Sequence, residues 1–501
     1  MTYQPCTPDY AQCAPDLNDV AANLVCAHAT PRALIKETRE VVDIARRFNK
    51  EVVRPYALEL DRKLHEDPDF LPWDFVKKAN DWGFYTMWIP RLFGGKGYFM
   101  HSMSAFVEEI GSACTAMANL IGVHYLGMAT LAASWNAPLM MKIFRDVAAG
   151  EKAGDPRIIS LAITEPSAGT DVEEPDLIDK GNITCHAKKV DGGYVVNGTK
   201  IFISNGHLSK WHVVIAYSDL DLPSQNTVCM LVQTGQKGFS FGRHEKKMGQ
   251  RACPASELVF KDCFVPDNMI ALDPEQIKDL KRDAKHTFQQ VLDYVLGATR
   301  AGVAAFATGA ARGAYEEALA FANETEVDGK LLANHEWAQC MLAEMYKNVN
   351  LARLAYMETN HHNASSGIYK SMLSKGMFQF SKYAPQFFVD KIAPTLLGNS
   401  LTTKWLRKQS FDSQPEDEMR RTSGWGSLAK FSGTDLGMKN CHMALELMGQ
   451  AGLRHDQRVE KHFRDAKLLQ IYEGTNQLNR LNLFKCLISR ACPQSCVFHD
   501  A

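Results

Sequence analysis

Apolar residues recur at helical spacing in two long parts of the chain and alternate with polar residues in the part between them. From about residue 33 to 155, segments such as ETREVVDIARRFNKEVVRPYALELDR repeat apolar positions every three and four residues, which predicts amphipathic helices. The same period returns after Pro274, in segments such as HTFQQVLDYVLGATRAGVAAFATGAARGAYEEALAFANE. The chain is therefore predicted to begin and end in helical domains.

The middle of the chain, from about residue 156 to 270, has the pattern of short antiparallel strands. β-Branched and aromatic residues alternate with polar ones in HAKKVDGGYVVNGTKIFIS, WHVVIAYS, TVCMLVQT and ELVFKDCFVP. Asp191-Gly192-Gly193 and Asn197-Gly198 both have the composition of hairpin turns. The predicted fold class is α+β, with a small antiparallel β domain inserted between two helical halves.

The chain of 501 residues is longer than one hydrophobic core usually supports, so several domains are expected. The predicted parts are an N-terminal extension (1–32), a helical domain (33–155), a β domain (156–275), a helical bundle (276–490) and a tail (491–501). An insertion at about 365–424 interrupts the bundle and is far longer than usual connections. Its aromatic and basic stretch MFQFSKYAPQFFVDKIAP is compatible with covering a substrate mouth, binding phosphate, contacting another subunit or extending into solvent.

Composition gives no reason to expect a polyanionic partner. The net charge of −1 favours neither nucleic acid nor an anionic membrane surface. The 13 cysteines lack zinc-site spacing, so free thiols in a reducing compartment are expected, Cys492 and Cys496 included. The His361-His362 pair is expected to be a solvated helix end. Without a signal-like N-terminus or a run of about 18 apolar residues, we expect a cytoplasmic protein with no membrane span.

One carboxylate near the end of the chain occupies an unusual position. In LLQIYEGTNQLNR, Glu473 follows Tyr472 where a helical pattern ends, and Gly474 allows the backbone to leave the helix. Two interpretations fit this context. Glu473 is either a buried base with a raised pKa or a solvated residue at a helix end.

Four stretches in the same order and spacing resemble one family, the flavin-dependent acyl-CoA dehydrogenases. They are LAITEPSAGTDV (161–172), NGTKIFISNG (197–206), KMGQRACPASELVFKDCFVP (247–266) and RDAKLLQIYEGTNQLNR (464–480). The resemblance extends over about residues 35–485. It implies an N-terminal helical domain, a middle β-barrel-like domain and a C-terminal four-helix bundle. It also implies FAD between the last two domains, a homo-oligomer in which a neighbouring subunit completes the flavin site, and electron-transferring flavoprotein as partner.

The chemistry implied by this resemblance is the α,β-dehydrogenation of an acyl-CoA thioester to the 2,3-enoyl-CoA. Glu473 would remove the α-proton while the flavin accepts the β-hydride. The backbone N–H of Glu473 and a flavin ribityl hydroxyl would bind the thioester oxygen. Some family members place the base directly before the arginine that matches Arg300. Thr299 stands there and cannot act as a base, which leaves Glu473 as the catalytic carboxylate.

The resemblance also assigns binding residues, and no metal site. Those implied for the cofactor are Ile163, Thr164, Thr170, Phe202, Ser204, Gly449, Thr475 and Gln477. Those implied for the substrate are Thr170, Arg300, Tyr472 and Gly474. An amphipathic strand with an inward aromatic residue is the alternative interpretation of Phe202 and Ser204.

Several positions depart from the family pattern. Thr325, Asp328 and Glu336 stand where the family has an arginine, a phenylalanine and a glutamine that reach the neighbouring subunit's FAD pyrophosphate. Losing that arginine removes a strong charge-assisted contact. In the segment ELMGQAG (446–452), Glu446 stands where the family has a glutamine and Gln450 where it has a second glycine. Gly297 stands where the family has an acidic partner of the substrate arginine, one turn before Arg300. Lys404, Arg407 and Lys408 of the insertion are the expected replacement phosphate ligands.

The acyl group and the electron acceptor are less constrained. The helix expected from Ala105 to Tyr125, which lines the acyl tail in relatives, contains no Lys or Arg. This argues against a dicarboxylic acyl group anchored by a salt bridge from this helix, although a cation of the long insertion could still reach such a group. A medium-sized apolar acyl group, branched or cyclic groups included, is predicted. Two alternatives to a dehydrogenase remain: an oxidase or flavin monooxygenase on the same fold, and a flavin-poor family member that serves as a binding subunit.

Overall fold

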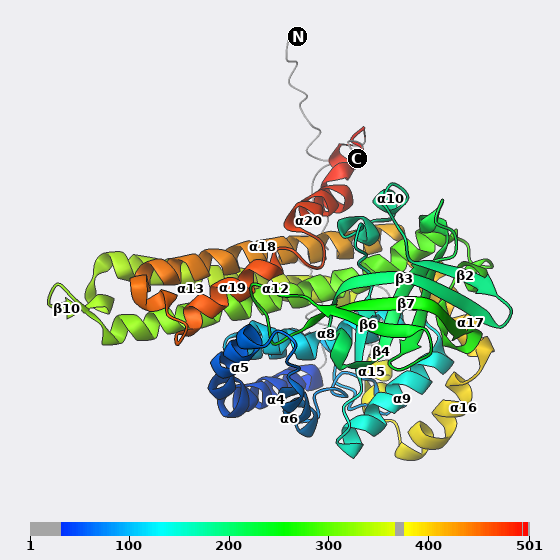
Figure 1. The fold of residues 1–501 in the computed structure, drawn as a ribbon, viewed down its shortest axis with the longest axis horizontal. Coiled ribbons are helices and arrows are strands. Elements are labelled where there is room, and N and C mark those ends of the chain that lie inside the picture. The colour runs from blue at the N-terminus through cyan, green and yellow to red at the C-terminus, as the bar shows by residue number, and fades with distance from the viewer. Residues whose placement is uncertain (1–31, 366–374, 493, 499–501) are drawn as a thin grey trace, which may run out of the picture.

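A computed structural model describes residues 32–365, 375–492 and 494–498. The long C-terminal helices α12, α13 and α18 lie side by side along the longest axis of the molecule (Figure 1). The N-terminal helices pack beneath them, and the strands gather at one end. This arrangement confirms the predicted α+β class with an N-terminal helical domain, a middle β domain and a C-terminal bundle.

The N-terminal domain consists of helices that each bury an apolar stripe. In α4, the buried residues Val41, Ala45 and Phe48 are spaced by four and three positions, as one face of a helix requires. The long helices of this domain are α4 (Arg32–Phe48), α5 (Arg54–Glu66), α6 (Trp73–Asp81), α7 (Met100–Gly111), α8 (Thr115–Ala133) and α9 (Ala137–Ala153). The single helix expected from Ala105 to Tyr125 is wrong, because the chain breaks at residues 112–114 and continues as a second helix.

Helix α8 is apolar on all sides because it runs through the interior. Among the described residues, it is the one helix long and apolar enough to cross a membrane by length and composition, although the sequence was expected to contain none. Most of its residues are buried inside the protein. Its length and hydropathy are therefore those of a core helix.

The middle domain is an eight-stranded sheet with mostly antiparallel pairing. Neighbouring strands follow the order β6-β7-β3-β2-β4-β5-β8. The remaining strand, β1, pairs with β4 in parallel. The parallel contact between β2 and β4 joins the two halves. The strands are β1 (Ile158–Ala162), β2 (His186–Val190), β3 (Gly193–Ser204), β4 (Ser209–Tyr217), β5 (Thr227–Gln233), β6 (Phe239–His244), β7 (Ala255–Pro266) and β8 (Ile270–Leu272).

Only one of the two expected glycine turns is a turn. Asp191 and Gly192 connect β2 to β3, with Gly192 at φ 76°. Asn197-Gly198 lies inside β3, where the register with β7 shifts between Val196 and Gly198. Its prediction as a turn is wrong, because a glycine inside a strand also serves a bulge.

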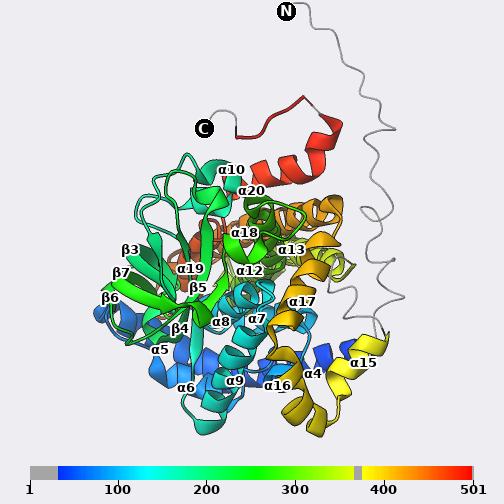
Figure 2. The ribbon, with the colours of Figure 1, turned by 90° about the vertical axis from the view of Figure 1, so that its right-hand side faces the viewer.

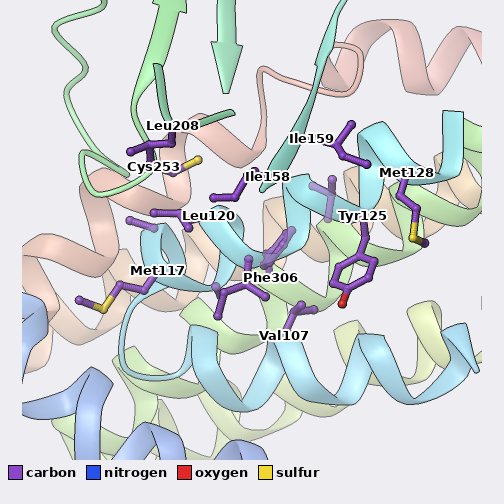
Figure 3. Packing of buried hydrophobic residues seen from close by; sticks show 14 of the residues in the cluster. Val107, Met117, Leu120, Tyr125, Met128, Ile158, Ile159, Leu208, Cys253 and Phe306 are labelled. Carbon is purple, nitrogen blue, oxygen red and sulfur yellow. The ribbon is translucent and has the colours of Figure 1, made fainter. Parts of the chain in front are cut away.

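The C-terminal bundle packs its helices closely through small residues. Its helices are α12 (Ala284–Glu324), α13 (Glu336–Ser365), α18 (Glu416–Met448), α19 (Arg458–Leu469) and α20 (Asn476–Leu483). A Cβ on Gly309 of α12 would lie 2.9 Å from Gly111 Cα of α7, so the two backbones are in contact. Phe306 of α12 lies among side chains of α7 and α8, including Val107, Leu120 and Tyr125 (Figure 3). The core therefore continues from the bundle into the N-terminal domain.

His362 lies inside this bundle and not at a solvated helix end. Its side chain is buried and stacks on Trp425 with ring centroids 4.3 Å apart. The expectation of a solvated pair is therefore wrong for His362, because α18 begins at Glu416, earlier than the sequence pattern indicated, and covers this part of α13.

The described part of the insertion packs against the N-terminal domain. It contains α15 (Lys375–Tyr383), α16 (Ala393–Leu397) and α17 (Ser400–Asp412). Figure 2 shows these helices running across α9 and back toward the bundle. Arg145 of α9 donates to the carbonyl of Val389 at 2.9 Å, and the Ala137 N–H donates to Thr403 at 3.2 Å. The insertion thus packs along the first half of α9.

Candidate active site

A cavity of about 460 Å³ lies where the three domains meet. The β domain, α8, α7, α12 and α13 all contribute side chains to its wall, and most of these are apolar. Glu173 and Glu473 are the only charged residues of the described chain that line it. Of the residues assigned from sequence, the cavity brings together Ile163, Thr164, Thr170, Phe202, Ser204, Tyr472, Glu473, Gly474 and Thr475.

Glu473 projects into this cavity from a tight loop between α19 and α20. It has φ 57°, and Gly474 follows with φ 77°. The left-handed region costs a non-glycine residue roughly 1–2 kcal/mol, and such strain is typical of functional sites. The Thr299 hydroxyl of α12 donates a hydrogen bond to a Glu473 carboxylate oxygen at 2.9 Å, which orients the Glu473 side chain.

The environment of Glu473 favours its protonated form. Burial raises the pKa of Glu473 to about 7, and the negative charge of Glu173 adds to the rise. Arg300, the Thr299 hydroxyl and Lys430 oppose this rise without cancelling it. Of the two interpretations from sequence, a buried carboxyl with a raised pKa is the one this environment matches.

Arg300 lies directly behind the cavity wall and is buried. Its guanidinium donates to the Glu473 carbonyl at 3.2 Å and to the Ser427 hydroxyl at 3.0 Å. It also forms an ion pair with Glu173 at 3.7 Å. Arg300 therefore holds the backbone of the Glu473 loop, instead of lining the cavity itself.

Glu173 is a residue that the sequence analysis missed. It belongs to the short helical turn after β1, and its carboxylate accepts a hydrogen bond from the Gly474 backbone. Burial raises the pKa of Glu173, and the charge of Arg300 counteracts this. The sequence did indicate that such a residue was needed. Gly297 replaces the family's acidic residue, so Arg300 lacks that carboxylate on its own helix. Glu173 supplies that carboxylate from another domain.

Lys430 supports the same loop from α18 and was also missed. It is buried and donates to the Gly474 carbonyl at 2.6 Å and to the Asn476 side chain at 2.9 Å. Burial lowers the pKa of Lys430 to about 7, and the nearby charge of Arg300 contributes. Asn479 donates to the Gly474 carbonyl as well, at 2.9 Å. The strained loop is thus fixed by side chains from three helices.

The facing wall comes from the β domain, and a buried ion pair fixes it. Lys200 of β3 donates to the Ile163 carbonyl at 2.9 Å and to Glu165 at 2.8 Å, with both side chains fully buried. Glu165 also accepts from the backbone N–H groups of Thr184 and Cys185. This network sets the position of Ile163 and Thr164.

Phe202 has a conformation that an ordinary strand residue would not adopt. It has φ 57° and remains 56% exposed although it lines the cavity. Ser204, two residues on, also lines the cavity. The alternative interpretation, an inward-packed aromatic of an amphipathic strand, is wrong for Phe202, because the bulge of β3 turns it out of the domain core.

Two of the residues assigned to the cofactor lie outside this cavity. Gln477 is exposed on α20. Gly449 is exposed at the end of α18, beyond Lys430 by roughly 28 Å of helix at about 1.5 Å per residue. Gly449 cannot contact the same part of a ligand as Glu473 within one chain.

The residues that depart from the family's FAD-pyrophosphate contacts, Thr325, Asp328 and Glu336, lie at the tip of the bundle. Thr325 caps α12, roughly 39 Å beyond Thr299 at about 1.5 Å per residue. A hairpin of β9 (Glu326–Val327) and β10 (Lys330–Leu331) follows, and its turn contains Asp328. Figure 1 shows β10 at the end of the molecule farthest from the sheet.

The insertion does not provide the cation cluster expected from sequence. Arg407 is buried and donates to the backbone carbonyls of Ser134 at 3.0 Å and Ala271 at 2.6 Å. Burial lowers the pKa of Arg407 to about 10. Its prediction as a phosphate ligand is wrong, because its donors hold main-chain groups. Lys404 and Lys408 are exposed on the same helix and do not line the cavity.

Three family models match most of the chain in order. The acyl-CoA dehydrogenase N-terminal domain matches residues 35–151, the middle domain matches 160–263, and the C-terminal domain matches 289–370 and 412–488. The chain belongs to the acyl-CoA dehydrogenase family. Members of this family are FAD-dependent oxidoreductases, so the resemblance seen in the sequence is confirmed. The insertion falls in the gap of the C-terminal match.

Known family members similar to this chain are distant in sequence. Cyclohex-1-ene-1-carbonyl-CoA dehydrogenase of Syntrophus aciditrophicus is 28% identical over 456 residues, which cover 90% of each chain. The short-chain-specific acyl-CoA dehydrogenase of Clostridium acetobutylicum is 27% identical, over 89% of this chain and 97% of its own. The structure of butyryl-CoA dehydrogenase from Megasphaera elsdenii has a TM-score of 0.68 and 22% identity, over 90% of this chain and 98% of its own. That likeness extends the family assignment to the fold.

Proposed function

We propose that this protein dehydrogenates an acyl-CoA thioester to the 2,3-enoyl-CoA, with Glu473 as the base that removes the α-proton and FAD as cofactor. The observation that supports this most directly is the carboxyl group of Glu473, which is half-buried in the wall of an apolar cavity and has a pKa raised to about 7. A base works best when its pKa is near the working pH. An exposed glutamate would be too weak a base for a thioester α-proton.

Thr299 and the strained backbone orient this base. The Thr299 hydroxyl donates to the carboxylate, which leaves the other carboxylate oxygen for the substrate proton. Arg300 and Lys430 hold the carbonyls of Glu473 and Gly474. These two hydrogen bonds restrain the loop next to the Glu473 N–H, and the resemblance assigns this N–H to the thioester oxygen. A fixed donor at that oxygen stabilises the negative charge that develops as the proton leaves.

The wall of the cavity suits the ring end of FAD. Ile163, Thr164, Thr170, Phe202 and Ser204 line it from the β domain, and Phe202 offers an unpacked aromatic face. The Tyr217 hydroxyl at the same wall is buried without a hydrogen-bond partner among the described residues, as expected of a site that holds a polar ligand. When bound, FAD supplies a hydride acceptor for the β-carbon.

The remaining assigned residues have supporting roles in this proposal. Thr475 caps α20 through its hydroxyl and so shapes the end of the loop. Tyr472 donates to Gln250 at 3.3 Å, which holds its ring against the cavity. Gly449 is exposed and lies roughly 28 Å of helix beyond Lys430 at about 1.5 Å per residue, so it would contact the FAD of a second copy of the chain. We therefore include a homo-oligomer in the proposal, with electron-transferring flavoprotein as acceptor and a cytoplasmic location.

Anaerobic mixing of the purified yellow protein with saturated acyl-CoA esters tests the proposal. We expect loss of flavin absorbance and formation of enoyl-CoA with medium-length esters. Glu473→Gln should keep its flavin and bleach about 1,000-fold more slowly, within the range for removing a general base. A colourless protein, or a Glu473→Gln variant as fast as the wild type, would overturn the proposal. Peroxide formed stoichiometrically in air would assign an oxidase instead.

A further inference from the structure

The cavity continues beyond Glu473, past helix α12, toward α7 and α13. A Cβ on Gly302 would meet nothing within 4 Å, so the space passes over α12 at this position. The cavity does not continue between α12 and α8, because Phe306 packs tightly on α8 there. A Cβ on Gly122 of α8 would lie 2.6 Å from the Phe306 ring. Beyond Gly302 the lining residues come from α7 and from the C-terminal end of α13.

Polar side chains gather in this part of an otherwise apolar cavity. They are His101 and Ser104 of α7 and Asn360 and Asn363 of α13, and all four line the cavity. Asn360 donates its amide to the Ser104 hydroxyl at 3.0 Å, which joins the two helices. Asn363 donates its amide to the Gly297 carbonyl of α12 at 3.2 Å. We call these four residues the distal polar set.

Two hydrogen-bond acceptors of this set lack a partner among the described residues. Asn363 is 8% exposed, and its side-chain oxygen accepts no hydrogen bond from residues 32–365, 375–492 or 494–498. The Nδ1 atom of His101 is likewise buried, with no hydrogen-bond partner in the part of the chain that the structure describes. Burial lowers the pKa of His101 to about 4, so its ring is neutral, and the ring forms a hydrogen bond with the backbone of Asn360. Buried polar atoms without partners are rare in native proteins and need an explanation.

We propose that the distal polar set is a subsite for a hydroxyl group on the acyl chain, remote from the thioester. A ligand hydroxyl can donate to Asn363 or His101 and accept from the Ser104 hydroxyl, which uses both of its capacities. A hydroxyl fits this lining better than a carboxylate, because no Lys or Arg among the described residues lines the cavity to neutralise a carboxylate. This inference rests on the proposed function and names its substrate class, a hydroxyacyl-CoA.

The length of the acyl chain follows from the geometry of α12. Glu473 contacts Thr299, and Asn363 contacts Gly297 within the same two turns, from a different side of the helix. A helix with its side chains is about 10–12 Å across, so a medium-length acyl chain can reach from the base to the distal polar set. A hydroxyl near the end of an eight-carbon chain meets this requirement.

Binding measurements test this subsite separately from turnover. The holoprotein is titrated calorimetrically with octanoyl-CoA and with its 6-, 7- and 8-hydroxy derivatives. We expect at least one hydroxy derivative to bind about tenfold more tightly than octanoyl-CoA, since a polar site discriminates strongly against an analogue that leaves it unpaired. Equal or weaker binding of all three derivatives would overturn the inference.

Asn363→Leu has a similar volume without the polar atoms and should abolish this preference or reverse it. Ser104→Ala removes a single hydroxyl and should reduce the preference several-fold, which keeps the test available if Asn363→Leu does not fold. Asn323→Leu is the matched control, because Asn323 is exposed on α12 and bonds only the Leu319 carbonyl of its own helix. A preference unchanged in both Asn363→Leu and Ser104→Ala would overturn the subsite. Preferential binding without bleaching would refute the proposed dehydrogenation and leave the subsite standing.

Discussion

The middle and the far end of helix α12 differ in how much of the family's chemistry they retain. Near the middle, Thr299 and Arg300 contact Glu473 in a buried network that one chain completes by itself. At its far end, Thr325 leads into an exposed hairpin, and the cation expected there for the FAD pyrophosphate is absent from that position. The reacting centre depends on contacts within one chain, whereas the tip would act only through a second copy. We therefore expect substitutions at the tip to leave the fold and the base unaffected.

The largest effect should come from Arg300→Lys at the reacting end. Lysine keeps the charge and loses the planar fork that reaches Glu473 and Ser427 together, so the Glu473 loop should shift. We expect kcat/KM to fall about 100-fold, as small misplacements of catalytic groups do. The control is Arg458→Lys, which pairs with Glu317 farther along α12 and should change kcat/KM less than about twofold. Equal losses in both variants would contradict the comparison.

The pH dependence of the wild-type enzyme should report the buried base. The raised pKa of Glu473, about 7, means that this carboxyl is mostly protonated, and hence inactive, at mildly acidic pH. We expect kcat/KM to be about 30-fold lower at pH 5.5 than at pH 8 and to level off above the pKa. The measurement is the rate of flavin bleaching across this range. A midpoint near the ordinary glutamate value would show that Glu473 is not desolvated.

At the tip, Thr325→Arg should restore a cation that this chain lacks. If a neighbouring subunit presents its FAD there, a charge-assisted contact should tighten FAD binding by about tenfold. Thr325→Gln, which is long but uncharged, is the control and should have little effect. FAD dissociation constants of the reconstituted proteins decide the outcome. Identical affinities for both variants would show that the tip does not contact the cofactor.

The smallest effect should come from Glu173→Gln. Removing this negative charge stabilises the ionised form of Glu473, so the pKa of Glu473 should fall and the pH midpoint of activity should move to lower pH. We expect a gain of about threefold in the rate at pH 6 relative to the plateau. Glu174→Gln is the matched control, because Glu174 pairs with Lys485 instead of Arg300. The result that would refute this role of Glu173 is an unchanged midpoint.

Much of the site could be predicted because its residues lie in short stretches with fixed local roles. Gly474 and the apolar periodicity before it located the Glu473 loop. Thr299 was found because it directly precedes Arg300, which matches the family's arginine. Glu173 and Lys430 escaped prediction because their partners belong to other elements of the fold, Arg300 for Glu173 and the Gly474 loop, 44 residues on, for Lys430. The Arg407 prediction failed for a related reason, since a cation in an aromatic segment looks the same whether it faces solvent or buried carbonyls.

The sequence by itself determined the order of helical and β domains, the family and the identity of the candidate base, because hydrophobic period and local motifs act over a few residues. Tertiary structure alone decided that Glu473 is desolvated and that Glu173 replaces the carboxylate missing at Gly297. It also decided that His101 and Asn363 face one cavity. Desolvation and pairing depend on which surfaces meet after folding, and no local pattern of residues specifies that.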